Sequence, residues 1–98
     1  MMTFESKLKS ADLDALFAAI LALENEEECY RFFEDIATIS EVKALAQRFL
    51  VAKMLMADET YTFIAQKTGA STATISRVNR SLNYGADGYK LILKRLEK

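Results

Sequence analysis

Several residue types that carry chemistry or shape turns are missing from this 98-residue sequence or scarce in it. It contains no histidine and no proline, one cysteine and three glycines. Since tight turns depend on proline and glycine, a sandwich or barrel of short strands is disfavoured and an all-α fold is favoured. There is no histidine to act as a general base or metal ligand, and Cys29 alone can form neither an intrachain disulfide nor a thiolate metal cluster. We therefore expect no metal site, no required cofactor and no enzyme activity.

Long apolar runs are also missing. No stretch approaches the ~18 apolar residues of a membrane span, and the first residues, MMTFESKLKS, lack the apolar core of a signal peptide. A hydrophobic share of 51% is nevertheless enough to build a core, and a chain of this length corresponds to one domain. We expect a single domain over residues 1–98 of a cytoplasmic protein with no membrane partner.

The small net charge of −1 conceals a strong asymmetry along the chain. Residues 1–45 carry four cations against ten acids, whereas residues 46–98 carry nine cations against four acids. Between Thr60 and Gly85 there is no acid, while three cations lie there: Lys67, Arg77 and Arg80. Such a division suggests an anionic partner for the second half of the chain.

Apolar residues recur at the i, i+3, i+4 spacing of amphipathic helices, and capping residues divide the chain into six of them. The predicted helices cover residues 10–21, 25–36, 40–58, 60–68, 71–82 and 87–96. Each opens on a residue whose side chain can cap the first turn, in chain order Ser10, Asn25, Ser40, Thr60, Ser71 and Asp87. Gly69 ends the fourth helix, and residues 83–88 form the one clear loop.

The first three predicted helices carry more large apolar residues than a small monomer can bury. A chain of this size buries about 60–70% of its unfolded surface, and several phenylalanines, Phe17, Phe32, Phe33 and Phe49, would compete for that interior. We interpret residues 1–58 as dimerisation helices, because exposed apolar patches are typical of partner surfaces. A closed monomeric bundle is the alternative. Cys29 lies on the apolar stripe of the second helix, and we expect a small buried hydrophobe rather than a redox switch.

Residues 60–82, TYTFIAQKTGASTATISRVNRSL, have the organisation of a helix-turn-helix. That motif needs a short helix, a tight turn at a residue that tolerates positive φ, and a second helix docked across the first. Gly69 supplies the turn. Apolar residues on both sides of it are spaced to form the junction between the helices: Ile64, Ala65, Ile75 and Val78.

The remaining positions of the second helix are predicted to face outward and suit DNA. Hydroxyl groups can reach phosphates or base edges, methyl groups can pack on thymine, and arginine can pair with phosphate or guanine. Lys67 and Arg80 are the predicted phosphate contacts. The predicted major-groove face consists of Thr72, Thr74, Ser76 and Arg77, and Ser71 and Ala73 complete the candidate DNA-binding set on this helix.

Four parts of the chain match the pattern of one known family: EVKALAQRF at 41–49, TGAS at 68–71, TATISRVNRSL at 72–82 and the helix after Asp87. Through them, the chain from Thr38 to about Leu96 resembles the tryptophan repressor superfamily and, within it, the TrpR-related YerC/YecD branch. The resemblance implies a six-helix fold and an intertwined homodimer whose helix-turn-helix heads bind operator DNA, usually for repression. At the start of the first DNA-binding helix, where the family has basic residues, this chain has Tyr61 and Thr62, and both are candidate contacts.

The resemblance further implies a ligand pocket. The two arginines that flank the indole in the family correspond to Arg48 and Arg77, and the hydroxyl residues of that pocket correspond to Thr38, Thr74 and Ser81. For Arg48, a surface salt bridge is the alternative to a ligand role. Val78 stands where the family has glycine. Its side chain either occupies space that the indole ring approaches or completes the helix-turn-helix junction. We therefore expect an amino-acid-like corepressor as the candidate effector, with Val78 arguing against tryptophan itself.

These observations predict a transcriptional regulator, with repression as its expected output, that binds double-stranded DNA as a homodimer. Residues 60–82 form the DNA-binding head, and residues 87–98 form the C-terminal helix. Half-sites one helical turn apart, about 34–36 Å, would give a palindromic operator. A protein-docking adaptor built on the same motif is the alternative, because three cations are few for a DNA-binding face.

Overall fold

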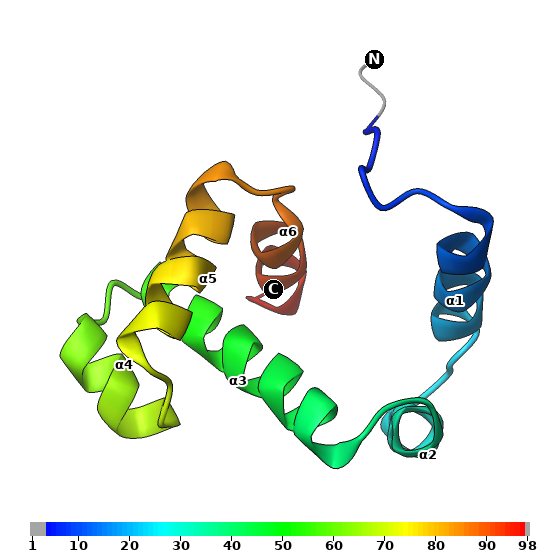
Figure 1. Ribbon diagram of the computed structural model, residues 1–98, viewed down its shortest axis with the longest axis horizontal. Helices are drawn as coiled ribbons and strands as arrows, with labels where there is room; N and C mark the ends of the chain where they lie inside the picture. The colour runs from blue at the N-terminus through cyan, green and yellow to red at the C-terminus, as the bar shows by residue number, and fades with distance from the viewer. Residues whose placement is uncertain (1–3, 98) are drawn as a thin grey trace. The chain divides into compact units, whose positions relative to one another are not determined.

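The computed structural model describes residues 4–97, which form six α-helices (Figure 1). In chain order these are α1 (Ala11–Leu21), α2 (Glu26–Ile36), α3 (Ile39–Met56), α4 (Tyr61–Thr68), α5 (Thr72–Tyr84) and α6 (Gly88–Glu97). No strand is found in this part of the chain, so the predicted all-α fold is confirmed. None of the six helices is long and apolar enough to cross a membrane. Residues 1–3 and 98, which the predicted domain and C-terminal helix include, lie outside the described residues.

Four of the predicted N-caps close the first turns of their helices. In each, the cap side chain accepts a hydrogen bond from the backbone N–H three positions on: Ser10 from Leu13, Asn25 from Glu28, Thr60 from Phe63 and Ser71 from Thr74. Each bond satisfies one of the donors that a helix N-terminus leaves without an intrahelical partner. Therefore α1, α2, α4 and α5 begin where the sequence predicted.

Other predicted helix boundaries are shifted by one or two residues. α3 begins at Ile39, so Ser40 lies within its first turn and does not cap it. α5 continues to Tyr84, so the loop predicted from Asn83 onward starts later. Asparagine disfavours helix interiors because its side chain competes for backbone partners. Here the Asn83 amide donates to the carbonyl of Asn79 one turn earlier, at 3.0 Å, and the residue remains helical.

Backbone hydrogen bonds cap the C-terminus of α3. The helix ends at Met56, two residues short of its predicted end, and Asp58 takes a left-handed conformation with φ of 62°. Glu59 N donates to the carbonyl of Met54 at 3.1 Å, and Asp58 N donates to the carbonyl of Leu55 at 3.0 Å. These bonds form a Schellman motif, and Asp58 takes the position in it that glycine usually occupies.

Asp87 precedes α6, but it does not cap the helix with its side chain. Its φ is 65°, and its backbone carbonyl accepts the first helical hydrogen bond, from Leu91 N at 2.9 Å. Among the hydrogen bonds found for the described residues, none uses the Asp87 carboxylate. The predicted side-chain cap is therefore wrong, because a left-handed backbone at this residue replaces the extended conformation that such caps require.

The chain divides into two compact units between Ile39 and Ser40. The second unit holds a buried core made by α3, α4, α5 and the turn between the last two: Val51, Ala52, Ile64, Ala70, Ile75, Val78 and Leu82. Two residues of α6, Tyr89 and Leu93, pack partly buried against this cluster. The core therefore lies directly beneath the predicted helix-turn-helix. The assignment of residues 1–58 to dimerisation stays a prediction.

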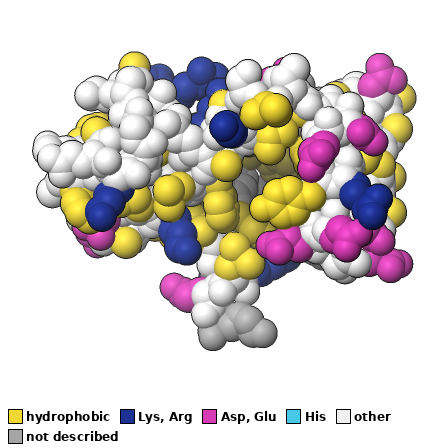
Figure 2. Space-filling model, turned by 90° about the horizontal axis from the view of Figure 1, so that it is seen from below, with side chains coloured by type: hydrophobic (Ala, Val, Ile, Leu, Met, Phe, Trp, Pro, Cys, Tyr) yellow, Lys and Arg dark blue, Asp and Glu magenta, His cyan; other side chains and the backbone are white. Residues whose placement is uncertain are grey.

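The first unit buries no residue between Phe4 and Ile39. Its helices leave large apolar side chains exposed, Leu21 by as much as 85%. Figure 2 shows hydrophobic side chains (yellow) at the surface of the face that it views. Cys29 is exposed as well, so the prediction of a buried cysteine is wrong for the single chain. The reason is that the apolar stripe on which it lies is not covered, since α2 contains no buried residue.

Candidate nucleic-acid interface

α4 and α5 pack against each other as the two helices of a helix-turn-helix (Figure 1). Their junction contains Ile64, Ile75 and Val78, whose exposed fractions are 0%, 0% and 2%. Ala65 packs beside them and is half-buried. The sequence assigned these four residues to the junction from their spacing around the turn, and that assignment is confirmed.

The turn between the helices is fixed by one glycine and a set of hydrogen bonds. Gly69 adopts φ of 73°, and nothing lies within 4 Å of the place that a Cβ would take, so the backbone conformation favours glycine here. Thr68 Oγ1 donates to the Ile64 carbonyl at 2.8 Å and accepts from Ala70 N at 3.0 Å. Gln47 Nε2 on α3 donates to the Thr68 carbonyl at 3.1 Å, which ties the turn to α3.

The face of α5 opposite the junction is exposed. Successive residues of a helix are rotated by about 100°, so Ile75, Val78 and Leu82 lie on one side of α5. The exposed residues of the other side include Thr72, Ala73, Ser76, Arg77 and Arg80, followed in the last turn by Asn83 and Tyr84. The first five were predicted to contact DNA, and the fold brings them onto one surface that offers hydroxyl, methyl and guanidinium groups.

The first turns of α4 and α5 contain the other predicted contacts. Tyr61 and Thr62 are exposed at the start of α4. Ser71 Oγ accepts from Thr74 N and donates to Thr74 Oγ1, both at 3.1 Å, and Thr74 is half-buried. These two hydroxyls close the first turn of α5, so a bond from either to DNA has to compete with the cap. Their contact with DNA stays a prediction.

Three exposed cations belong to the helix-turn-helix. Lys67 on α4 and both Arg77 and Arg80 on α5 are exposed, and within residues 4–97 none of them forms an ion pair with an acid. The Lys67 ammonium lies 5.6 Å from the centroid of the Phe63 ring, one turn earlier on α4, in a cation–π arrangement. With no acid to neutralise them, the three cations remain available to an anion such as a phosphate.

The predicted ligand residues are partly brought together. Thr74, Arg77 and Ser81 are spaced at i, i+3 and i+7 and so share one edge of α5. Arg48 on α3 is half-buried, and Thr38 belongs to the first unit. Of the two alternatives for Val78, its 2% exposure supports the packing role, because the side chain fills the helix-turn-helix junction.

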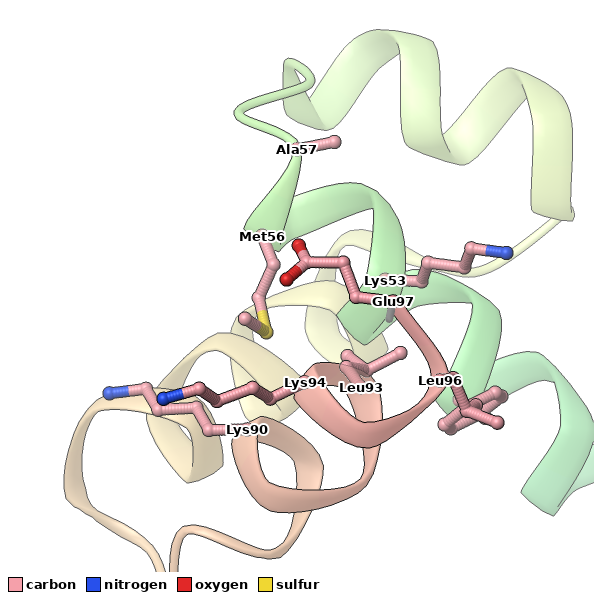
Figure 3. A pocket seen from close by; sticks show the side chains of 9 residues that line it. Lys53, Met56, Ala57, Lys90, Leu93, Lys94, Leu96 and Glu97 are labelled. Atoms are coloured by element: carbon pink, nitrogen blue, oxygen red, sulfur yellow. The ribbon is translucent and has the colours of Figure 1, made fainter.

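A groove of about 660 Å³ lies between α3 and α6 (Figure 3). Apolar side chains, including Met56, Leu93 and Leu96, line it, and Lys90 and Lys94 extend in the same direction from α6. It shares no residue with the predicted DNA-binding or ligand-binding sets. The described residues contain no cluster of three or more acidic, cysteine or histidine side chains that could hold a metal ion.

Sequence reasoning missed two side chains that shape this region. Gln47 bonds to a carbonyl 21 residues away, and no local pattern marks such an amide. Phe63 is different, because its contact with Lys67 is an i, i+4 pair whose spacing alone was a usable signal. Long-range polar contacts therefore needed the fold, whereas the aromatic contact did not.

Comparisons with known proteins agree with this geometry. The family profile described as Trp repressor protein matches residues 11–97, so the similarity begins well before Thr38, where the motifs placed its start. A Bacillus subtilis protein named YerC, which is described as uncharacterized, is 55% identical over 92 residues, covering 94% of this chain and 88% of that protein. A Trp operon repressor homolog from Chlamydia caviae is 34% identical over 77 residues, covering 78% of this chain and 76% of the relative.

A solved structure supports the same grouping. A TrpR like protein from Eubacterium eligens matches with a TM-score of 0.90 at 60% sequence identity. The match covers 93% of this chain and 94% of that one. At this identity and coverage, the similarity extends through both compact units and is not confined to the helix-turn-helix.

Proposed function

Because the chain belongs to the Trp repressor family, a family of helix-turn-helix DNA-binding transcription regulators and not of enzymes, we propose that it is a repressor that binds a palindromic operator as a homodimer. The observation that carries the proposal is the division of α5 into two faces. One face is buried in the core, while the opposite face presents polar, methyl and guanidinium groups on a stretch, residues 60–86, that contains no acid. A recognition helix in the major groove needs this combination.

Within the proposed complex, Arg77 reads a base, since a guanidinium on the exposed face can bond bidentately to guanine. Lys67 and Arg80 contact phosphates and set the register of the head on the duplex. The remaining positions supply hydroxyl and methyl contacts or shape the helix starts. The full proposed interface is Tyr61, Thr62, Lys67, Ser71, Thr72, Ala73, Thr74, Ser76, Arg77 and Arg80.

The homodimer is supported by what the single chain leaves uncovered. No residue of the first unit between Phe4 and Ile39 is buried, although Phe17 and Leu21 are large and apolar. Apolar side chains of this size gain stability by leaving water, and a second copy of the chain offers the matching surface. Two heads in such a dimer would reach half-sites about one helical turn apart, in the compartment that holds the chromosome, the cytoplasm.

We also propose that an amino-acid-like corepressor binds along the edge of α5. The proposed contacts are Thr38, Arg48, Thr74, Arg77 and Ser81. Arg77 belongs to both the DNA-binding and the ligand-binding set, so a ligand carboxylate paired with it would change the orientation of the residue that reads the operator. Because Arg77 would contact both ligands, binding of the effector would directly change the affinity for DNA.

The proposal is tested by capture of DNA with the purified full-length protein. Sheared genomic DNA of the source organism is offered at several salt concentrations, and the retained fragments are sequenced. We expect enrichment of a palindrome and a steep loss of binding with added salt, because cations on the protein displace counterions from phosphates. Capture of random fragments alone would contradict operator binding. Retention of no DNA with or without added amino acids would favour the protein-docking adaptor.

A further inference from the structure

α3 is attached to the helix-turn-helix at two places. The first is apolar, where Val51 and Ala52 of α3 join the buried cluster that contains Ile64. The second is the hydrogen bond from Gln47 Nε2 to the Thr68 carbonyl, which is 3.1 Å long and partly buried. Gln47 precedes Val51 by four residues, so the two attachments lie about 6 Å apart, or one helical turn, along α3.

The two attachments constrain the head in different ways. Apolar packing is not directional, so the buried cluster alone resists separation of α3 from α4 and α5 more strongly than it resists rotation. A hydrogen bond is directional and weakens steeply when its angle changes. Placed one turn from the cluster, the bond from Gln47 opposes rotation of the head about that cluster.

The acceptor of this bond is itself held firmly. The Thr68 carbonyl belongs to the last turn of α4, where backbone oxygens lack an intrahelical partner. The hydroxyl of the same residue donates to the Ile64 carbonyl at 2.8 Å and accepts from Ala70 N at 3.0 Å. A displacement of the Thr68 carbonyl would therefore also displace the turn and the start of α5, because the same residue is bonded to both sides of the turn.

We propose that Gln47 is a positioning residue that sets the angle of the helix-turn-helix on α3 and thereby the half-site spacing that the protein accepts. This inference rests on the proposed homodimer and palindromic operator. In a symmetric dimer, rotation of each head on its α3 changes the separation of the two recognition helices. Gln47 acts through Thr68 and contacts no base or phosphate.

The experiment selects DNA from a pool of duplexes with a randomised core, using the full-length protein. Sequencing the bound DNA gives the half-site and the distribution of spacings between its two copies. Three variants are compared with the wild type. Gln47→Met keeps the side-chain length but removes the donor, Gln47→Lys keeps a donor, and Gln66→Met removes the amide from an exposed residue of α4 that makes no hydrogen bond among those found in the described chain.

We expect the wild type, Gln47→Lys and Gln66→Met to select one sharp spacing. In Gln47→Met, the preference for that spacing over spacings one base pair longer or shorter should fall by about fivefold, since one neutral hydrogen bond contributes about that factor, while the half-site sequence stays the same. A merely stabilising role would lower the melting temperature without broadening the distribution.

Three results would overturn the inference. A Gln47→Met variant that keeps the sharp spacing would show that the buried cluster fixes the angle unaided. Equal broadening in Gln47→Met and Gln47→Lys would show that the hydrogen bond is not the cause. A wild-type protein that selects no paired half-sites would overturn the proposed operator binding, and this inference with it, so the two failures can be told apart.

Discussion

The carbonyl oxygen of Ser81 accepts the backbone N–H of Gly85 at 2.9 Å and occupies the space that a Cβ on Gly85 would need. Gly85 has φ of −91°, so crowding by Ser81, and not a left-handed backbone, is what requires glycine there. The contact ends α5 and lets the chain turn toward α6. The position of α6 against the core therefore depends on the absence of one methyl group.

Replacement of Gly85 by alanine should lower the free energy of unfolding by about 1–3 kcal/mol, because the added methyl group forces the backbone of α5 to move. Gly88→Ala is the matched control, since nothing lies within 4 Å of its Cβ position. That substitution should be neutral or stabilise by up to about 1 kcal/mol through the lower entropy of the unfolded chain. Urea denaturation of both variants measures the difference, and equal effects would contradict it.

Replacement of Asp58 by glycine should stabilise the fold. A residue with a Cβ pays about 1 kcal/mol for a left-handed backbone, less for aspartate than for most, and Asp58 has φ of 62°. Asp58→Gly should therefore raise the free energy of unfolding slightly, by less than about 1 kcal/mol. Glu59→Gly, next to it but without a positive φ, should lower it instead through added chain entropy. Thermal unfolding that shows the same sign for both variants would contradict this account.

Val78→Gly should be strongly destabilising. Val78 is 2% exposed in the helix-turn-helix junction, so the change removes a buried side chain worth about 1.5–3 kcal/mol and adds the lower helix propensity of glycine relative to valine, less than about 1 kcal/mol. Ser81→Gly, at an exposed position of the same helix, carries only the second cost. Calorimetry with tryptophan then tests the pocket: binding by a still folded Val78→Gly variant would show that Val78 alone had closed it.

The parts of this fold that could be predicted depend on neighbours in sequence. Ser71 caps α5 and Gly69 turns the chain because each acts on residues within four positions. The buried face of α5 could be predicted for the same reason, since Ile75 and Val78 follow helical spacing. The bond from Gln47 could not, because its acceptor lies 21 residues away. The prediction for Cys29 failed for a related reason. The sequence pattern identifies the apolar stripe of α2, but it does not tell whether another element covers that stripe.

Within the proposed interface, substitution of Arg77 and substitution of Arg80 should affect DNA binding in different ways. Arg77→Ala should cost about 1–3 kcal/mol of binding to the selected operator and relax the preference at one base pair, as for a bidentate base contact. Arg80→Ala should weaken operator and unrelated DNA alike and reduce the slope of log K against log salt by about 1. Fluorescence anisotropy over a salt series separates the two. If Arg77→Ala bound the operator as tightly as the wild type, Arg77 would not be the base-reading residue.

Phe17 gives the most direct test of the proposed homodimer. On α1 it lies on the stripe of Leu13 and Ile20, which no element of the described chain buries. Phe17→Glu should raise the dimer dissociation constant at least about 100-fold, because each of two symmetric copies loses an apolar contact worth about 1.5–3 kcal/mol and places a charge in the interface.

Ala15 lies on the opposite side of α1 and is exposed as well, so Ala15→Glu adds the same charge to the same helix without touching the stripe. Sedimentation equilibrium should therefore find the wild type and Ala15→Glu as dimers and Phe17→Glu as a monomer with the same helical content. Since one head covers only one half-site, the Phe17→Glu variant should also lose most of its affinity for a palindrome while keeping its weak affinity for a single half-site. A wild-type protein that sediments as a monomer would mean that the apolar face of α1 serves a different partner, and the adaptor reading would then account better for the exposed first unit.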